Sequence, residues 1–314
     1  MQNEPKRTVV VLGTGGTIAG SAASADDNLD YVAGTVSVGA LVASASHDSD
    51  VTIEAEQVAQ VDSKDMDFAI WRRLVERVAH HLARREVAGV VVTHGTDTLE
   101  ETAYFLSRVV AASKPVVLTA AMRPASSRQT DGPQNLADAI GVAALEGRAG
   151  VVVAFAGALH SAREIRKVHP YCLDAFSSGD AGPLARIEEG RLREFRAWPV
   201  QAASGVDRLR DAPSDWPWVE IVTSTAGTDG RVVGALVEAG VDGIVVAGTG
   251  NGSLHRELEA ALDVADRRGV SVLRSTRCLD GAIVEASPGR FDSARDLTPV
   301  KARVDLILQL LARH

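Results

Sequence analysis

The feature that most limits how this chain can fold is a series of short, valine-rich apolar runs that end in glycine, threonine or serine. The clearest runs span residues 8–12, 89–93, 115–120, 150–154, 219–223, 243–247 and 270–274. Most are followed by amphipathic segments of helical length, at residues 66–82, 98–111, 135–145, 232–239, 254–267 and 300–311. Runs without polar alternation are typical of strands covered on both faces. The pattern predicts an α/β fold with mostly parallel sheets flanked by helices.

The pattern breaks down once, in a charged stretch at residues 186–218 that contains prolines and tryptophans. Such a stretch is typical of a domain boundary. The chain has 314 residues, which suits two domains at about 150 residues each. We therefore predict a larger N-terminal domain at residues 1–190, a linker at 191–216 and a smaller C-terminal α/β domain at 217–314.

Composition excludes several classes of protein. The 33 basic and 41 acidic residues give a net charge of −8 that is spread along the chain, which argues against a nucleic-acid binder. The two cysteines, Cys172 and Cys278, show no C-x-x-C spacing, so we expect neither a disulfide framework nor a zinc site. Apolar stretches stay well below the ~20 residues of a membrane span. Residues 1–7 lack the apolar core of a secretion signal, so a cytoplasmic protein is expected.

The first apolar run leads into a glycine-rich turn, GTGGTIAG at residues 13–20. Ile18 occupies the third glycine position of a dinucleotide-binding fingerprint, which disfavours a dehydrogenase, and no Gly-Lys-Ser/Thr follows to make a P-loop. What remains is Thr17 at the carboxyl end of a strand, where open α/β sheets bind ligands. The alternative is a tight turn whose threonine only caps a helix.

A second turn of the same kind, THGTDTLEE at residues 93–101, follows another valine run. Thr96 or Asp97 caps the next helix, or both face a crevice shared with Thr17. Two parallel strands that each end in a Gly-Thr turn favour the crevice. A hydroxyl nucleophile needs a base or a cation beside it, and we find no G-x-S-x-G or H-E-x-x-H motif. The candidate activators are Tyr31, Asp97, Lys167 and Glu285.

Helix ends give further predictions. Ser63 is expected to cap the helix at residues 66–82, with Asp65 and Asp67 in its first turn. Two neighbouring histidines, His80 and His81, belong to the same charged helix. We expect both of them to face solvent.

Six segments, in the same order along the chain, resemble the bacterial-type L-asparaginases. They read TGGTIAG at 14–20, YVAG at 31–34, HGTDTLEETAYFL at 94–106, AMRP at 121–124, DGPQN at 131–135 and GNG at 250–252. The resemblance extends from about residue 8 to about residue 311, and the two threonine motifs together make it specific. It implies two α/β domains, the first larger, and a homotetramer built from intimate dimers.

The resemblance also implies amide hydrolysis by two groups centred on threonines. Thr17 matches the nucleophile, assisted by Tyr31 on a mobile loop that corresponds to residues 20–36. Small and polar residues suit that loop to act as a lid that excludes water. Thr96, Asp97 and Lys167 match a second triad.

The substrate contacts follow from the same resemblance. Ser63 matches a residue that binds the substrate's α-carboxylate, and Asp97 one that pairs with its α-ammonium. Backbone N–H groups near Gly16 and Thr96 are candidate donors to the oxyanion. The remaining predicted substrate-binding residues are Lys64, Gly95 and Ala121, with Asn251 and Glu285 reaching into a neighbouring subunit's site.

Two departures from the family pattern stand out. Lys64 occupies a position where many members have glutamine, and it either changes the charge beside the substrate or points to solvent. Neither Cys172 nor Cys278 lies where secreted members carry a disulfide, which agrees with a reducing compartment.

We therefore predict an L-asparagine amidohydrolase that forms a threonine acyl-enzyme and uses no metal or organic cofactor. One alternative is a dual glutaminase-asparaginase or a related amidase with the same residues, because one methylene is worth only ~1–3 kcal/mol in a pocket. An alternative of another class is a non-catalytic protein that binds amino acids. The reactive hydroxyls of Thr17, Tyr31 and Thr96 argue against it.

Overall fold

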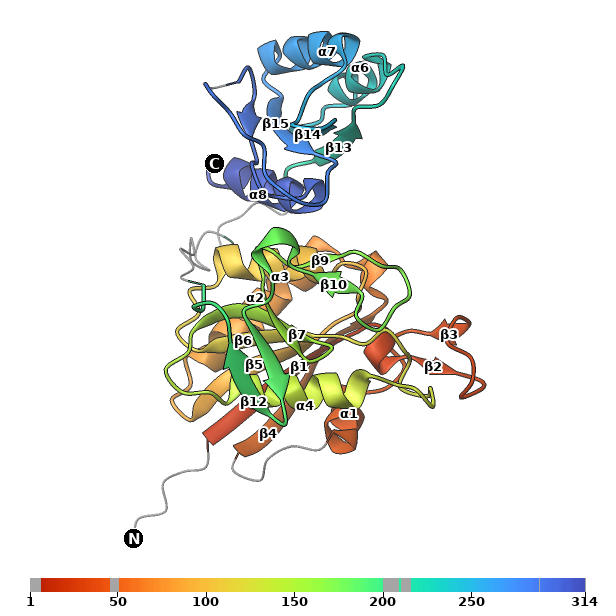
Figure 1. The fold of residues 1–314 in the computed structure, drawn as a ribbon, viewed down its shortest axis with the longest axis vertical. Coiled ribbons are helices and arrows are strands. Elements are labelled where there is room, and N and C mark those ends of the chain that lie inside the picture. Colours follow the sequence, from red (N-terminus) through yellow and green to blue (C-terminus); the bar gives the residue numbers. More distant parts are fainter. Residues whose placement is uncertain (1–6, 46–50, 200–208, 210–215, 288, 314) are drawn as a thin grey trace. The chain divides into compact units, whose positions relative to one another are not determined.

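The computed structural model describes residues 7–45, 51–199, 209, 216–287 and 289–313. The chain divides into two compact units, Met1–Leu209 and Arg210–His314, and each has its own main sheet (Figure 1). Within the described ranges, no helix has the length and apolar character needed to cross a membrane.

The first unit is built on an eight-stranded sheet in the order β12-β11-β8-β7-β6-β5-β1-β4. Its strands are β1 (Arg7–Gly15), β4 (Val51–Val61), β5 (Val87–Thr93), β6 (Pro115–Thr119), β7 (Gly150–Phe155), β8 (Ala158–Ser161), β11 (Ala185–Glu188) and β12 (Arg191–Glu194). The five strands from β4 to β7 run parallel, whereas β8, β11 and β12 pair antiparallel. The carboxyl ends of β1, β5 and β6 therefore lie at one edge of the sheet.

The helices that cover this sheet in the described part of the unit are α1 (Val38–Ser44), α2 (Phe68–Leu82), α3 (Leu99–Val109) and α4 (Gly132–Ala143). Helices α1 and α4 contact each other on one face, and α2 and α3 contact each other on the opposite face (Figure 1). On the first face, Val9 and Val11 belong to one core cluster with Leu136 and Ile140. Because helices cover both faces, these strands need apolar side chains in both directions.

Several short elements connect the larger ones. Two hairpins have strands of only two residues, β2 (Ser21–Ala22) with β3 (Tyr31–Val32) and β9 (Arg166–Lys167) with β10 (Phe176–Ser177). Short 3-10 helices are formed at η1 (Thr17–Ala19), η2 (Ser63–Asp65) and η3 (Gly179–Ala181).

The second unit has a parallel sheet in the order β13-β14-β15-β16. Its strands are β13 (Val219–Thr223), β14 (Gly243–Gly248), β15 (Ser271–Thr276) and β16 (Asp292–Ser293), and its helices are α6 (Arg231–Glu238), α7 (Arg256–Arg267) and α8 (Pro299–Leu311). Helices α6 and α7 contact each other, and α8 packs on β13, β14 and β15. Val233, Ile244 and Leu258 belong to its core cluster.

The predicted α/β class is confirmed, and every predicted strand and helix is present with its ends shifted by no more than three residues. Strand β4 was not predicted, because the prediction rested on unbroken apolar runs, whereas β4 alternates polar and apolar residues along a sheet edge. The predicted linker at 191–216 begins too early, since residues 191–194 form β12 and pair with β11. Residues 200–208 and 210–215 of that linker lie outside the described residues.

Two predictions about helix α2 are corrected. Its cap is Asp67, whose Oδ1 accepts from the N–H of Ile70 at 2.7 Å, whereas Ser63 begins η2. His80 is exposed as predicted, but His81 is only 5% exposed. Its Nε2 lies 2.8 Å from a carboxylate oxygen of Glu56 on β4, and its Nδ1 lies 3.1 Å from the guanidinium of Arg84.

Candidate active site

The turn that follows β1 can be made only by glycines. Gly15 and Gly16 have φ values of +102° and +79°, which side-chain-bearing residues rarely adopt. A Cβ on Gly15 would lie 2.4 Å from the carbonyl oxygen of Val61, and a Cβ on Gly16 would lie 2.3 Å from the Cα of Gly95. The turn leads directly into η1, whose first residue, Thr17, is 8% exposed.

Thr17 is hydrogen-bonded to the residue predicted as its partner. Its Oγ1 lies 2.7 Å from the Oη of Tyr31, and either hydroxyl can donate. Tyr31 comes from the hairpin of β2 and β3, which returns to the turn through a bond from the N–H of Gly34 to the carbonyl of Gly16 at 3.1 Å. The tyrosine ring also packs over Gly20, where a Cβ would lie 2.8 Å from ring carbon Cδ2.

The second glycine turn packs directly against the first. Strands β1 and β5 are parallel neighbours, with Gly13 opposite Thr93. Beyond them, Gly95 lies between Gly16 and Ser63, because a Cβ added to Gly95 would lie 2.4 Å from Ser63 Oγ and 3.1 Å from Gly16 Cα. The two turns therefore meet backbone to backbone.

Thr96, Asp97 and Lys167 form one hydrogen-bonded group. The ammonium of Lys167 donates to Thr96 Oγ1 at 2.8 Å and to Asp97 Oδ1 at 2.7 Å. Thr96 is 5% exposed, whereas the side chain of Asp97 is 53% exposed. Helix α3 begins at Leu99 with Thr98 in its cap position. The alternative in which Thr96 or Asp97 caps this helix is therefore wrong.

Ser63 and Lys64 are neighbours in sequence but have different surroundings. Ser63 is 2% exposed, and its Oγ accepts from the backbone N–H of Asp97 at 3.2 Å. The side chain of Lys64 is 65% exposed and forms an ion pair with Asp62 at 2.8 Å. The Asp62 carboxylate raises the pKa of Lys64 above its usual value. Of the two, Ser63 contacts the second turn and Lys64 pairs on the surface.

Ala121 follows β6 and is fully buried. A Cβ added to Gly132 would lie 3.5 Å from the Cβ of Ala121 and 3.1 Å from the side chain of Ile18. The next residue, Met122, donates its N–H to Asp131 Oδ2 at 3.0 Å. These contacts place Ala121 between the start of α4 and the turn that carries Thr17.

A buried hydrogen-bonded chain supports the second turn, and sequence analysis did not find it. The indole N–H of Trp71 donates to Thr102 Oγ1 at 2.9 Å, which lies 3.0 Å from His94 Nε2. His94 Nδ1 lies 2.8 Å from the carbonyl oxygen of Gly95 and must donate to it. Burial lowers the pKa of His94 to about 4. The position of His94 directly before Gly95 was visible in the sequence. Its hydrogen-bond partners could not be predicted, because they come from helices α2 and α3.

Asn251 and Glu285 belong to the second unit, where they lie close together. Asn251 Nδ2 donates to the carbonyl of Val284 at 2.8 Å, and Asn251 Oδ1 accepts from the N–H of the same residue at 2.8 Å. Glu285 pairs with Arg274. Val284 itself is 77% exposed. Within this unit, the two predicted residues thus share one surface beyond the carboxyl end of β14.

Both parts of the chain match known family models. Residues 8–199 match the model described as "Asparaginase, N-terminal", and residues 218–314 match the one described as "Glutaminase/Asparaginase C-terminal domain". This chain belongs to the asparaginase family. The predicted resemblance to bacterial-type asparaginases is therefore confirmed.

Relatives match this asparaginase-family chain over nearly its whole length. It is 37% identical to "L-asparaginase 2" of Bacillus subtilis, over 96% of this chain and 81% of the relative. It is 35% identical to the "Glutaminase-asparaginase" of Pseudomonas fluorescens, over 94% of this chain and 84% of the relative. The crystal structure of a probable cytoplasmic L-asparaginase from Campylobacter jejuni matches with a TM-score of 0.90 and 38% identity, over 97% and 95% of the two chains.

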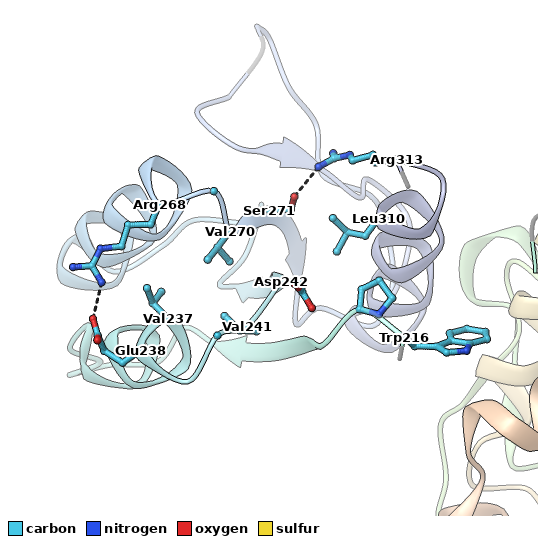
Figure 2. A pocket seen from close by; sticks show the side chains of 13 residues that line it. Trp216, Val237, Glu238, Val241, Asp242, Arg268, Val270, Ser271, Leu310 and Arg313 are labelled. Carbon is cyan, nitrogen blue, oxygen red and sulfur yellow. Dashed lines mark hydrogen bonds and ion pairs between the residues drawn. The ribbon is translucent and has the colours of Figure 1, made fainter. Parts of the chain in front are cut away.

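Two hollows are lined by none of the residues predicted from the asparaginase resemblance. One, of about 980 Å³, opens at the amino ends of β13, β14 and β15 (Figure 2). Its polar side chains already pair, Arg268 with Glu238 and Arg313 with Ser271. The other, of about 910 Å³, lies at the amino ends of β1, β5 and β6. Among the described residues, no three His, Cys, Asp or Glu side chains gather as metal ligands.

Proposed function

We propose that this chain hydrolyses the side-chain amide of L-asparagine to L-aspartate and ammonia by double displacement, with Thr17 as the nucleophile. The observation that supports this most strongly is the meeting of two glycine turns, which brings two partnered hydroxyls to one edge of the sheet. A protein that only binds amino acids needs no such hydroxyls. Membership of the asparaginase family makes the chain an amidohydrolase.

In the first displacement, Thr17 Oγ1 attacks the amide carbon, and its proton passes to the Tyr31 oxygen 2.7 Å away while Tyr31 gives its own hydroxyl proton to solvent. The negative charge that develops on the amide oxygen is stabilised by backbone N–H groups near Gly16 and Thr96. Collapse of the tetrahedral intermediate breaks the carbon–nitrogen bond, and ammonia leaves. The product of this step is a β-aspartyl ester of Thr17. Water then hydrolyses this ester and restores the threonine.

The second group suits the proton transfers in both steps. Lys167 donates to Thr96 Oγ1, so the hydroxyl hydrogen of Thr96 is free to point toward the reacting amide. Thr96 can give this proton to the leaving nitrogen and take another from the ammonium of Lys167, which regains a proton through Thr96 from the attacking water in the second displacement, while Thr17 regains its own through Tyr31. Asp97 holds that ammonium in place at 2.7 Å. A positioned acid of this kind accelerates a reaction ~10²–10⁴-fold.

Recognition of the amino-acid substrate needs a donor for its carboxylate and an acceptor for its ammonium. We assign the first role to Ser63 and the second to Asp97, with Gly95 and Ala121 contributing backbone groups. The family also contains glutaminase-asparaginases, and one methylene changes the binding energy by only ~1–3 kcal/mol. Glutamine is therefore the second substrate to test.

We further propose a homotetramer in which Asn251 and Glu285 of one subunit complete the site of its neighbour. The support is their shared exposed surface beside Val284. Light scattering tests the assembly, since a fully active monomer would contradict it. A cytoplasmic location is also proposed, because both cysteines, Cys172 and Cys278, are free and exposed, as suits a reducing compartment.

The decisive experiment compares ammonia release from L-asparagine and L-glutamine by wild type, Thr17→Ala and Thr52→Ala. Thr52 is an exposed threonine on β4, so its variant controls for loss of a hydroxyl elsewhere. We expect Thr17→Ala to lose ~10³-fold or more in kcat and the control to match wild type. Near-normal release by Thr17→Ala would disprove the nucleophile. If the wild type bound aspartate but released no ammonia, the result would support the alternative of a non-catalytic protein that binds amino acids.

A further inference from the structure

The hairpin that carries Lys167 has very short strands, and its outer loop exposes most of its apolar side chains. Strands β9 and β10 pair over only two residues each, with Lys167 opposite Phe176. The connecting loop, residues 168–175, exposes three apolar side chains: Val168 is 42%, Tyr171 45% and Leu173 43% exposed. Burial of apolar surface therefore contributes little to the conformation of this loop.

One buried arginine, Arg123, contacts Tyr171 at the tip of this loop. The guanidinium carbon of Arg123 lies 4.0 Å from the centre of the Tyr171 ring, within range of a cation–π contact. Its Nη1 also donates to the carbonyl oxygen of Tyr171 at 3.0 Å. His169 Nδ1 accepts from the backbone N–H groups of Tyr171 and Cys172 at 3.0 and 2.9 Å, which closes the loop into a tight turn.

Arg123 is itself fixed to the rigid part of the first unit. It is 8% exposed, and its backbone N–H donates to Asp131 Oδ1 at 2.9 Å. Asn135 on α4 donates to the other oxygen of Asp131 at 3.1 Å and to the carbonyl of Ala120 at 2.9 Å. The turn after β6 and the start of α4 are thus connected, through one guanidinium, to the loop beyond Lys167.

We propose that Arg123, by holding Tyr171, is a positioning residue that keeps the Lys167 ammonium on Thr96 and Asp97. This inference rests on the proposed function, because it assumes that Lys167 takes part in the reaction. The main-chain N–H of Lys167 is held from the other side by Glu100 at 3.2 Å. The stacking contact can be removed by a substitution at Tyr171, which leaves Lys167, Thr96 and the turn after β6 unchanged.

The test uses the full-length protein and the variants Tyr171→Ala, Tyr171→Phe and Lys167→Met. Tyr171→Ala removes the ring that Arg123 stacks on, and we expect kcat for L-asparagine to fall about tenfold with KM changed by less than about twofold, since small misplacement of a catalytic group is costly. Tyr171→Phe keeps the ring and should retain the wild-type kcat. In the Lys167→Met background, adding Tyr171→Ala should cause no further loss.

A second readout does not depend on activity. Cys172 is exposed and adjoins Tyr171, whereas Cys278 is exposed in the second unit. In Tyr171→Ala, the rate of alkylation of Cys172, followed by peptide mass spectrometry, should rise about threefold or more as the loop opens. The rate at Cys278 should not change, and the melting temperature shows whether the variant is folded.

The outcomes separate the two claims. Full activity of Lys167→Met would remove Lys167 from the proposed function, and the positioning role would fall with it. If Lys167→Met is inactive while Tyr171→Ala keeps normal kcat and normal Cys172 alkylation, only the positioning role is wrong. An equal loss of kcat in Tyr171→Ala and Tyr171→Phe would also overturn it, because the ring would then not be the part that matters.

Discussion

The two threonine centres are built alike but have partners of different charge. Each threonine follows a glycine turn at the carboxyl end of a strand, and β1 and β5 are neighbours. Each partner comes from a hairpin with two-residue strands. Thr17 faces the neutral phenol of Tyr31, whereas Thr96 faces the Lys167 ammonium, which is also paired with Asp97. One centre suits nucleophilic attack and the other suits the supply of protons.

The two hairpins also differ in how they are held. The Tyr31 hairpin exposes Leu29 by 78% and Val32 by 65%, and its ion pair between Asp26 and Arg128 lies on the surface, where such pairs contribute little. A two-stranded hairpin is marginal by itself. The Lys167 hairpin has instead a buried arginine at its tip. The comparison teaches that two hairpins with equally short strands are held by different kinds of contact, the Tyr31 hairpin by backbone bonds to the Thr17 turn and the Lys167 hairpin by a buried guanidinium.

The largest effect is expected when the second centre loses its hydroxyl. Thr96→Val keeps the shape of the side chain but leaves Lys167 Nζ without its acceptor at 2.8 Å. We expect kcat to fall about 10³-fold, comparable with Thr17→Ala, because the proton donor is lost. Steady-state ammonia release checks this. If Thr96→Val lost less than about tenfold, the two centres would not be equal partners.

A smaller effect is expected from the first hairpin. Tyr31→Phe removes only the Oη that lies 2.7 Å from Thr17 Oγ1, while the ring still packs over Gly20. We expect kcat to fall about 10²-fold, within the range of a single proton-transfer group. Leu29→Ala changes an exposed side chain on the same hairpin and should stay within about twofold of wild type. Equal losses in both variants would assign the effect to hairpin closure rather than to the hydroxyl.

The third prediction concerns the pH dependence of stability. Burial lowers the pKa of His94, in the Thr96 turn, to about 4, and that of His160 to about 4 as well. In the unfolded chain a histidine has a pKa of about 6.5. The unfolded state therefore binds more protons between these values, so the free energy of unfolding falls as pH drops from about 6.5 to about 4. Between pH 7 and 5 the loss is about 2 kcal/mol for each histidine.

Urea unfolding at pH 7 and pH 5 measures this slope. His94→Gln should reduce the fall in the free energy of unfolding between pH 7 and pH 5 by the contribution of one histidine. His80→Gln, which changes an exposed ring on α2, should leave this fall unchanged. An unaltered slope in a folded His94→Gln variant would mean that His94 becomes charged within the native state. The turn that carries Thr17 offers a contrast, since Gly15 stands where His94 stands in the second turn.

The features that could be predicted from the sequence are those encoded in local patterns or shared with a known family. Unbroken valine runs revealed the parallel strands, and two Gly-Thr turns revealed the shared edge of the sheet. The supporting contacts remained hidden because they join distant positions: Trp71 to Thr102, and Arg123 to Tyr171 across 48 residues. Strand β4 was not predicted because strands were assigned from unbroken apolar runs, which are typical of strands covered on both faces, whereas β4 alternates polar and apolar residues.

The smallest expected effect separates Lys64 from its neighbour Ser63. Lys64 is held by Asp62 at 2.8 Å and is largely exposed, so Lys64→Gln should change kcat and KM for L-asparagine by less than about threefold, in keeping with a surface ion pair. Ser63→Ala removes the buried hydroxyl that we assign to the substrate's α-carboxylate and should raise KM about tenfold, since a hydrogen bond to a charged group contributes about 1.5–3 kcal/mol. Kinetics with both amides measures this pair. If Lys64→Gln strongly changed the ratio of kcat/KM for glutamine to that for asparagine, Lys64 would lie at the substrate and determine specificity.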